Sequence, residues 1–135
     1  MDIHELRAKC IPLFRCHSIE DCNALLDIYA DFLFKTVQKH QLDDVDTVAD
    51  AQAKIILQMM LTKILHLKSI IAGINYTSEN GVSLKGIIDP TALAVLIRNV
   101  YETVGMFNLI YRTTKTSDEK LIIYDLWVHA GLSYR

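Results

Sequence analysis

The sequence predicts an all-α domain, an antiparallel (up-and-down) bundle of four to five helices. Apolar residues recur every three or four positions through each long segment, as one face of an α-helix requires. Hydrophobic residues make up 51% of the chain, which holds only 5 Gly and 2 Pro. The hairpin dipeptide Asn80-Gly81 lacks alternating apolar flanks, so we expect essentially no sheet.

The length of the chain indicates a single helical-bundle domain over residues 1–135. A chain of this size buries roughly two thirds of its unfolded surface, enough for a core of its own. The formal charge is −2, and no third of the chain is strongly basic. A large phosphate-binding surface needs a cluster of cations. Binding to nucleic acid is therefore not favoured.

The first part of the chain predicts two helices. A short helix over residues 2–15 carries an apolar stripe that is interrupted near Pro12. Ser18 is placed to cap a second helix, because acidic residues follow it and apolar residues then recur at helical spacing. We expect this second helix to run to about His40.

The segment LDDVDTVAD has aspartates at three of the offsets found in an EF-hand calcium loop. The position that needs Gly is Ala49, and the position that needs a bidentate carboxylate is Ile55. These departures exclude the calcium loop. The segment instead predicts a helix start with Thr47 as the N-cap and Asp50 at the third position.

A third helix, from residue 51 to about residue 74, is apolar nearly all round. Lys54, Lys63, His66 and Lys68 interrupt the apolar run. A centrally placed Lys costs on the order of 2.5–3.5 kcal/mol in a membrane span, so we do not expect one here. Such a helix is typical of the centre of a bundle or of a subunit contact, with its Lys side chains reaching outward.

Residues 74–89 are rich in Asn, Ser and Gly and predict a connection across one end of the bundle. Asp89 then caps a fourth helix with Pro90 at its first position, which is the strongest boundary signal in the chain. This helix should extend to about Arg112.

We expect Ser117 to cap a fifth helix, with acidic residues in its first turn. The short connection before it favours antiparallel packing against the fourth helix. The fifth helix reaches Tyr134 and Arg135 without a clear closing cap, a pattern consistent with a fragment of a longer chain.

Three cysteines, Cys10, Cys16 and Cys22, are spaced six residues apart, so they do not share one face of a helix. Zinc ligands are normally paired two to four residues apart, and the di-iron motif Glu-x-x-His does not occur. We therefore expect buried or idle thiols, no metal site, no cofactor and a reducing, cytoplasmic setting.

Two pairs of polar residues are the candidate binding residues: Arg98 with Glu102, and Asp125 with His129, each one helical turn apart. Antiparallel packing of the fourth and fifth helices would bring both pairs into one cluster. In a functional cluster, Arg98 would hold an anion and His129 would move a proton. In a structural cluster, the pairs would satisfy each other's charge. The residue types favour the structural alternative. The sequence contains no motif that identifies a catalytic residue.

The segment from Ile87 to Arg135, with Arg-x-x-x-Glu in LIRNVYETV followed by IIYDLWVHAGLSYR, resembles uncharacterised helical proteins of Bacteroides-type bacteria. More distantly it resembles the HEPN superfamily. The resemblance implies a bacterial helical bundle, often dimeric. Nucleases of that superfamily use an Arg followed within a few residues by a His. This chain departs from the pattern, because His129 precedes Arg135 and no His follows Arg98 closely.

Two functions follow from the sequence. The first is a non-enzymatic module that self-associates into a homodimer or other homo-oligomer, or binds a protein partner, and does not enter a membrane. It rests on the all-round apolar third helix and on the absence of a catalytic motif. The alternative is a HEPN-like RNase or nucleotide-binding domain that uses Arg98 and His129.

Overall fold

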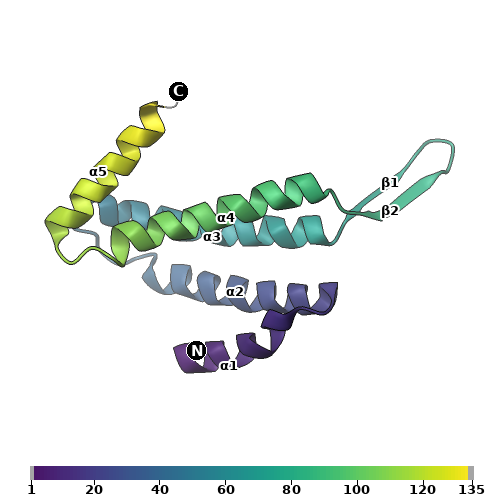
Figure 1. Cartoon of the computed structure of the whole chain (residues 1–135), viewed down its shortest axis with the longest axis horizontal. Helices are drawn as coiled ribbons and strands as arrows, with labels where there is room; N and C mark the ends of the chain where they lie inside the picture. Colours follow the sequence, from purple (N-terminus) through teal and green to yellow (C-terminus); the bar gives the residue numbers. More distant parts are fainter. Residues whose placement is uncertain (1, 134–135) are drawn as a thin grey trace.

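The computed structural model describes residues 2–133 and is mostly helical (Figure 1). Its elements are α1 (Ile3–Cys10), the 3₁₀-helix η1 (Ile11–Arg15), α2 (Ile19–His40), α3 (Val48–Ile71), β1 (Ile74–Thr77), β2 (Ser83–Ile87), α4 (Pro90–Tyr111) and α5 (Ser117–Ser133). The sequence predicted an all-α domain, and the structure is mostly α. The predicted extension of the last helix to Tyr134 and Arg135 lies outside the described residues.

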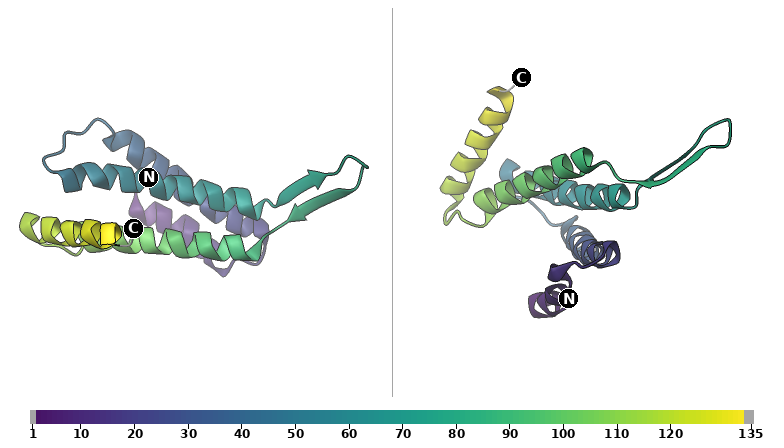
Figure 2. Two further views of the ribbon diagram at one scale, coloured as in Figure 1. Left: turned by 90° about the horizontal axis from the view of Figure 1, so that it is seen from above. Right: turned by 45° about the vertical axis from the view of Figure 1, so that its right-hand side comes forward.

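The helices form an open layer (Figures 1 and 2). α3 lies between α2 and α4 and runs antiparallel to both, while α1 and η1 pack against α2. The core lies between α2 and α3, where Leu26, Ala30 and Ile64 are buried together. α5 contacts the layer at its beginning and then turns away from α4 (Figure 1). The third helix, predicted for the centre of a bundle or for a subunit contact, thus has a helix on each of two sides.

Three helix starts are confirmed together with their caps. The side chains of Ser18, Thr47 and Asp89 accept hydrogen bonds from the backbone N–H groups of Asp21, Asp50 and Thr91, at 3.1, 3.1 and 2.8 Å. The cap of α5 differs from the prediction: Thr116 Oγ1, not Ser117, accepts a hydrogen bond from the Glu119 N–H at 3.2 Å. The Glu119 carboxylate accepts a bond from the Lys115 N–H in return, at 2.8 Å. This arrangement differs from a capping box in one bond, because Glu119 accepts from the N–H of the residue before the cap and not from that of Thr116.

The expected absence of a sheet is wrong. β1 and β2 form an antiparallel hairpin that extends the α3–α4 pair beyond the end of the layer (Figure 2). Ile74 pairs with Ile87, and Tyr76 pairs with Leu84, so the register shifts by one residue between the two pairs. This irregularity places Leu84 and Ile87 on one face although they are three positions apart. It also breaks the apolar–polar alternation by which a strand is recognised in a sequence.

α3 ends at Ile71, about three residues before the predicted end, because Gly73 adopts φ 80°, which a helix cannot continue. Its lysines also behave differently from the expected outward reach. Lys63 Nζ donates to Thr103 Oγ1 on α4 at 2.6 Å, and Lys68 pairs with Asp27 on α2. Lys54 donates to backbone carbonyl groups of the loop after α2. These lysines therefore join α3 to its neighbours.

Candidate interaction surface

A series of open hollows lies between α3 and its neighbours α4 and α5. The largest, about 730 Å³, separates the second half of α3 from the first half of α4, and its apolar walls include Val95 and Leu96. A smaller hollow, about 280 Å³, lies where α3, α4 and α5 meet and includes Met59 and Trp127. Val95 is 65% exposed and Met59 is 43% exposed, so these apolar walls are open to solvent.

Neighbouring hollows share wall residues, so they form one surface. Asn99 lines the first and the second hollow. Trp127 lines the second hollow and a third of about 350 Å³ between α3 and α5. We call this surface the α3–α4–α5 face. Its defining residues are Met59, Lys63, Val95, Asn99, Glu102 and Trp127.

Charged and titratable side chains enter the face from both α3 and α4. Lys63 and His66 come from α3, whereas Asp89 and Glu102 come from α4. Lys63 and Glu102 line the same hollow from opposite helices, and there Lys63 Nζ is bonded to Thr103 and Glu102 to Arg98. The face is therefore apolar along its length, and its charges Lys63 and Glu102 have partners within the chain.

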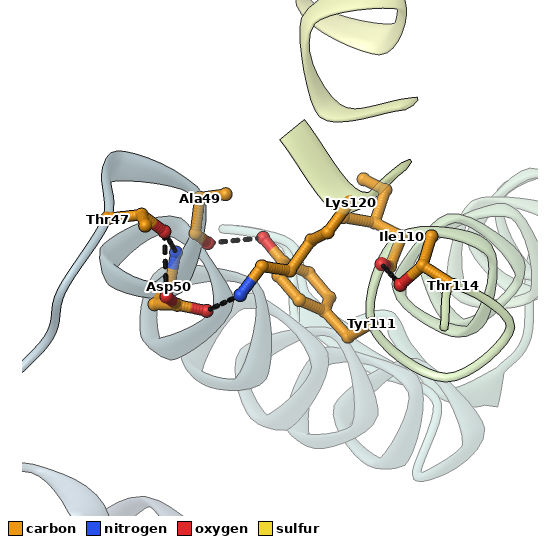
Figure 3. A network of polar contacts seen from close by, with 7 residues as sticks. All are labelled: Thr47, Ala49, Asp50, Ile110, Tyr111, Thr114 and Lys120. Carbon is orange, nitrogen blue, oxygen red and sulfur yellow. Dashed lines mark hydrogen bonds and ion pairs between the residues drawn. The ribbon is translucent and has the colours of Figure 1, made fainter. Parts of the chain in front are cut away.

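A polar network attaches α5 to the rest of the protein at one end of this face (Figure 3). Lys120 Nζ, in the first turn of α5, lies 2.6 Å from Asp50 Oδ1, in the first turn of α3. Tyr111, at the end of α4, donates its hydroxyl proton to the Ala49 carbonyl at 2.6 Å. Asp50 also accepts a hydrogen bond from Thr47 Oγ1 at 2.7 Å.

The network changes the acid–base behaviour of two of its members. The hydrogen bond from Lys120, with that from Thr47, holds the pKa of the Asp50 carboxyl below its ordinary value. Burial, with a smaller effect of Tyr124 and Asp50, raises the pKa of Tyr111 to about 12. Across the neutral pH range, Asp50 therefore stays ionised and Tyr111 keeps its hydroxyl proton, as the network requires. Sequence reasoning identified Asp50 only as a helix-start residue and did not find its partner, which is 70 positions away.

The predicted pairing of Arg98 with Glu102 is confirmed, with Arg98 Nε donating to Glu102 Oε1 at 2.8 Å. The side chains are 81% and 54% exposed, so the pair lies in solvent and not in a helical core. The predicted antiparallel packing of α4 and α5, which would have brought this pair to Asp125 and His129, is wrong. α5 turns away from α4 (Figure 1), and both Asp125 and His129 are exposed on it.

Between residues 2 and 132, no three His, Cys, Asp or Glu side chains are arranged to hold a metal ion. Cys10 is buried, Cys22 is partly buried and Cys16 is exposed, and all three are free thiols. Burial raises the pKa of the Cys22 thiol, which disfavours the thiolate that a nucleophile requires.

The protein exposes far more surface than a compact monomer of its size. A monomer of 15.4 kDa is expected to expose about 7,200 Å². This chain exposes 9951 Å², a surplus of roughly 2,800 Å². In the part of the chain that the structure describes, exposed large hydrophobic side chains outnumber the buried ones.

One described helix, α4, is long and apolar enough to cross a membrane when judged by length and composition alone. A helix of this kind in a soluble core would be mostly buried, but only 6% of the apolar stretch of α4 is buried. α4 therefore has an apolar surface that the single chain leaves uncovered.

Searches against protein-family models, curated proteins and solved structures find no match to this chain.

Proposed function

We propose that this protein is a non-enzymatic, cytoplasmic helical module whose function is self-association, with a second copy bound on the α3–α4–α5 face. The observation that carries the proposal is the surplus of exposed surface, combined with an uncovered apolar face on the central helix pair. Burying apolar surface is the main driving force of protein association.

The size of the surplus supports a second copy as the occupant. A standard protein–protein interface buries about 800 Å² on each partner, and obligate homodimers bury about 2,000–5,000 Å² in total. Two chains that each buried a surplus of roughly 2,800 Å² would lie at or slightly above the upper end of that range. The surplus of exposed surface is thus of the magnitude that a tight homodimer removes from solvent. The projecting hairpin makes up part of this surplus.

The same association would complete the helical bundle that the sequence predicts. In one chain, α2 packs against α3, and α4 packs against α3 without a helix of its own to cover its apolar surface. If two such pairs packed face to face, they would form a four-helix antiparallel core, which is a stable arrangement for helices with one apolar face each. The bundle then belongs to the dimer and not to the single chain.

A membrane is a weaker explanation of the exposed α4. Arg98 and Glu102 lie near its middle, and each charged residue there costs about 2.5–3.5 kcal/mol in a membrane span. In a protein interface the same two residues can remain at the solvent-exposed rim.

The HEPN-like alternative would use Arg98 and His129 on RNA or on a nucleotide. It receives less support, because the two residues lie on helices that diverge and neither lines the hollows described above. A site made by both residues would need a second chain or a different position of α5.

Sedimentation velocity across the micromolar range tests the proposal. We expect a dimer for the parent protein and a shift to monomer for Val95→Asp, which places a charge in the largest hollow. Leu42→Asp is the control, because Leu42 is 87% exposed in the loop after α2 and lies outside the face. A parent that stays monomeric at high micromolar concentration contradicts the proposal, as does a monomer that co-sediments with phospholipid vesicles.

A further inference from the structure

The β1–β2 hairpin is amphipathic, and its apolar face is uncovered. On the polar face Thr77 pairs with Ser83, and their hydroxyl oxygens lie 2.9 Å apart. The opposite face carries four large hydrophobic side chains, each at least 45% exposed: Ile74, Tyr76, Leu84 and Ile87. A two-stranded hairpin is at best marginally stable in water unless it packs against a helix or further strands. The apolar face therefore requires a partner.

α5 carries a second uncovered apolar surface. Ile122, Leu126 and Ala130, spaced four residues apart, form an exposed stripe along this helix, which we call the α5 stripe. Tyr124 and Trp127, on the other side of α5, are partly buried. A helix that is apolar on all sides is normally buried in a core, yet Ile122 and Leu126 are 60% and 65% exposed. The outer side of α5 therefore also requires a partner.

The two uncovered surfaces lie at opposite ends of the α3–α4 pair (Figure 1). The hairpin continues from one end of the pair, and α5 is attached at the other end through Lys120 and Asp50. Both elements rise on the same side of the pair (Figure 1). Every residue of β1 and β2 is exposed, so the described helices of the same chain do not cover the hairpin.

A two-fold axis across the helices would bring these opposite ends together. Two identical surfaces that pack face to face are related by a two-fold axis lying in the plane of contact. Rotation about an axis across the helices reverses the direction of the α3–α4 pair, so each hairpin comes to the α5 end of the other copy. An axis along the helices would instead leave hairpin beside hairpin and α5 beside α5.

We propose, on the basis of the proposed self-association, that the apolar face of each hairpin docks on the α5 stripe of the second copy. One symmetry operation then covers both surfaces in both copies. The lengths agree, because the apolar part of β2 from Leu84 to Ile87 spans about 10 Å and the stripe from Ile122 to Ala130 about 12 Å. The contact also supplies the helix that a two-stranded hairpin needs.

Two opposite charges, one on each surface, test the docking. Tyr76→Asp places an acidic group in both hairpins of a homodimer, and Leu126→Lys places a basic group in both α5 stripes. A charge buried against apolar atoms weakens each of the two contacts, so we expect each variant to dimerise roughly a hundredfold more weakly than the parent.

Mixing the two variants identifies which surfaces meet. Their heterodimer has one unchanged contact and one contact in which the introduced charges attract each other. We expect it to form with an affinity within about threefold of that of the parent. Sedimentation velocity with one variant fluorescently labelled measures all three affinities.

Thr77→Asp is the control for the hairpin, because Thr77 is next to Tyr76 on the polar face, where a carboxylate can still accept a hydrogen bond from Ser83. Leu42→Lys is the control for α5, because it makes the same change at an exposed position in the loop after α2. We expect neither control to change dimerisation.

Three results would contradict the expectation. Single variants that dimerise like the parent would overturn the docking while leaving self-association intact. Two weakened variants whose mixture gives no more heterodimer than random exchange would also overturn it, because each surface would then meet something other than its proposed partner. A monomeric parent would instead overturn self-association itself.

Circular dichroism confirms that each variant keeps its helical content. If a charged variant does not fold, Tyr76→Ser and Leu126→Ser take its place, since they shorten the apolar side chains without adding charge. Each is then expected to weaken dimerisation, and their heterodimer, which keeps one unchanged contact, is expected to be tighter than either homodimer. An unchanged affinity in both would contradict the docking.

Discussion

Asp50 in the first turn of α3 and Lys120 in the first turn of α5 form an ion pair, with 2.6 Å between Oδ1 and Nζ. The two side chains are 32% and 20% exposed, so the pair is partly shielded from solvent. It fixes the beginning of α5 against the beginning of α3, although the rest of α5 turns away from α4. The position of Trp127 in the α3–α4–α5 face therefore depends on a contact two turns earlier in the same helix.

Replacing Lys120 with Met should lower the free energy of unfolding by roughly 1–2 kcal/mol, between the values typical of exposed and buried pairs. The Met side chain keeps most of the apolar stem of Lys, so the loss reports mainly on the charge. Urea unfolding measures the change. Lys115→Met, in the exposed connection before α5, is the control and should leave the midpoint unchanged.

The same pair predicts how stability depends on acid. The folded-state pKa of Asp50 is lowered, so the unfolded state binds a proton first as the pH falls. The stabilisation is therefore complete above the ordinary pKa of 3.8 and is lost as the pH falls through the lower folded value. Lys120→Met should remove much of this acid dependence. An identical pH profile for parent and variant would count against the pair.

Tyr111→Phe should cost about 1 kcal/mol of unfolding free energy, because it removes the hydrogen bond from the Tyr111 hydroxyl to the Ala49 carbonyl. In the parent, the pKa of Tyr111 is raised from 10.0 to about 12, so the unfolded state loses its proton first as the pH rises. This contribution to stability is present below pH 10 and is lost toward pH 12. Thermal unfolding in alkaline buffer should show a smaller loss for Tyr111→Phe than for the parent.

Arg98→Ala and Glu102→Ala should each leave the midpoint of urea unfolding of the chain nearly unchanged. The two residues are bonded to each other one turn apart on an exposed surface, where water replaces a lost partner. A double-mutant cycle should give a coupling close to zero. The measurement is best made on a monomeric background such as Val95→Asp, so that loss of dimerisation does not add to the result. A large coupling would indicate that the pair is buried in solution.

Two glycines of the hairpin region, Gly73 and Gly81, give a matched test of its geometry. Both have positive φ, 80° and 82°, so Ala is strained at either position. A Cβ on Gly73 would lie 2.7 Å from the carbonyl carbon of Gly86, whereas a Cβ on Gly81 would meet nothing within 4 Å. We expect Gly81→Ala to cost about 1 kcal/mol and Gly73→Ala to cost roughly 1–3 kcal/mol more.

Amide hydrogen exchange of the hairpin residues measures this difference. Gly73→Ala should increase exchange at the base of the hairpin, where β1 and β2 approach most closely, and Gly81→Ala only near the turn. Equal effects of the two substitutions would show that β1 and β2 do not meet as described.

The sequence alone determined which segments are helical and where most helices begin. The cap side chains accept hydrogen bonds from N–H groups two or three residues away, as at Ser18, Thr47 and Asp89. The contacts that define these helix starts are therefore local and can be recognised in the sequence. The pairing of Arg98 with Glu102 was visible for the same reason, because helical geometry alone brings residues four positions apart together.

Only the tertiary structure decided the rest, because it depends on contacts between distant residues. The partner of Asp50 is 70 positions away, and neither residue carries a local sign of the other. The hairpin was missed because the shift in register places Leu84 and Ile87 three positions apart, which hides the apolar–polar alternation in β2. The exposure of Arg98 and Glu102 could not be predicted from the sequence either. α5 could have covered α4, but its attachment through Lys120 leaves the surface of α4 around these two residues open.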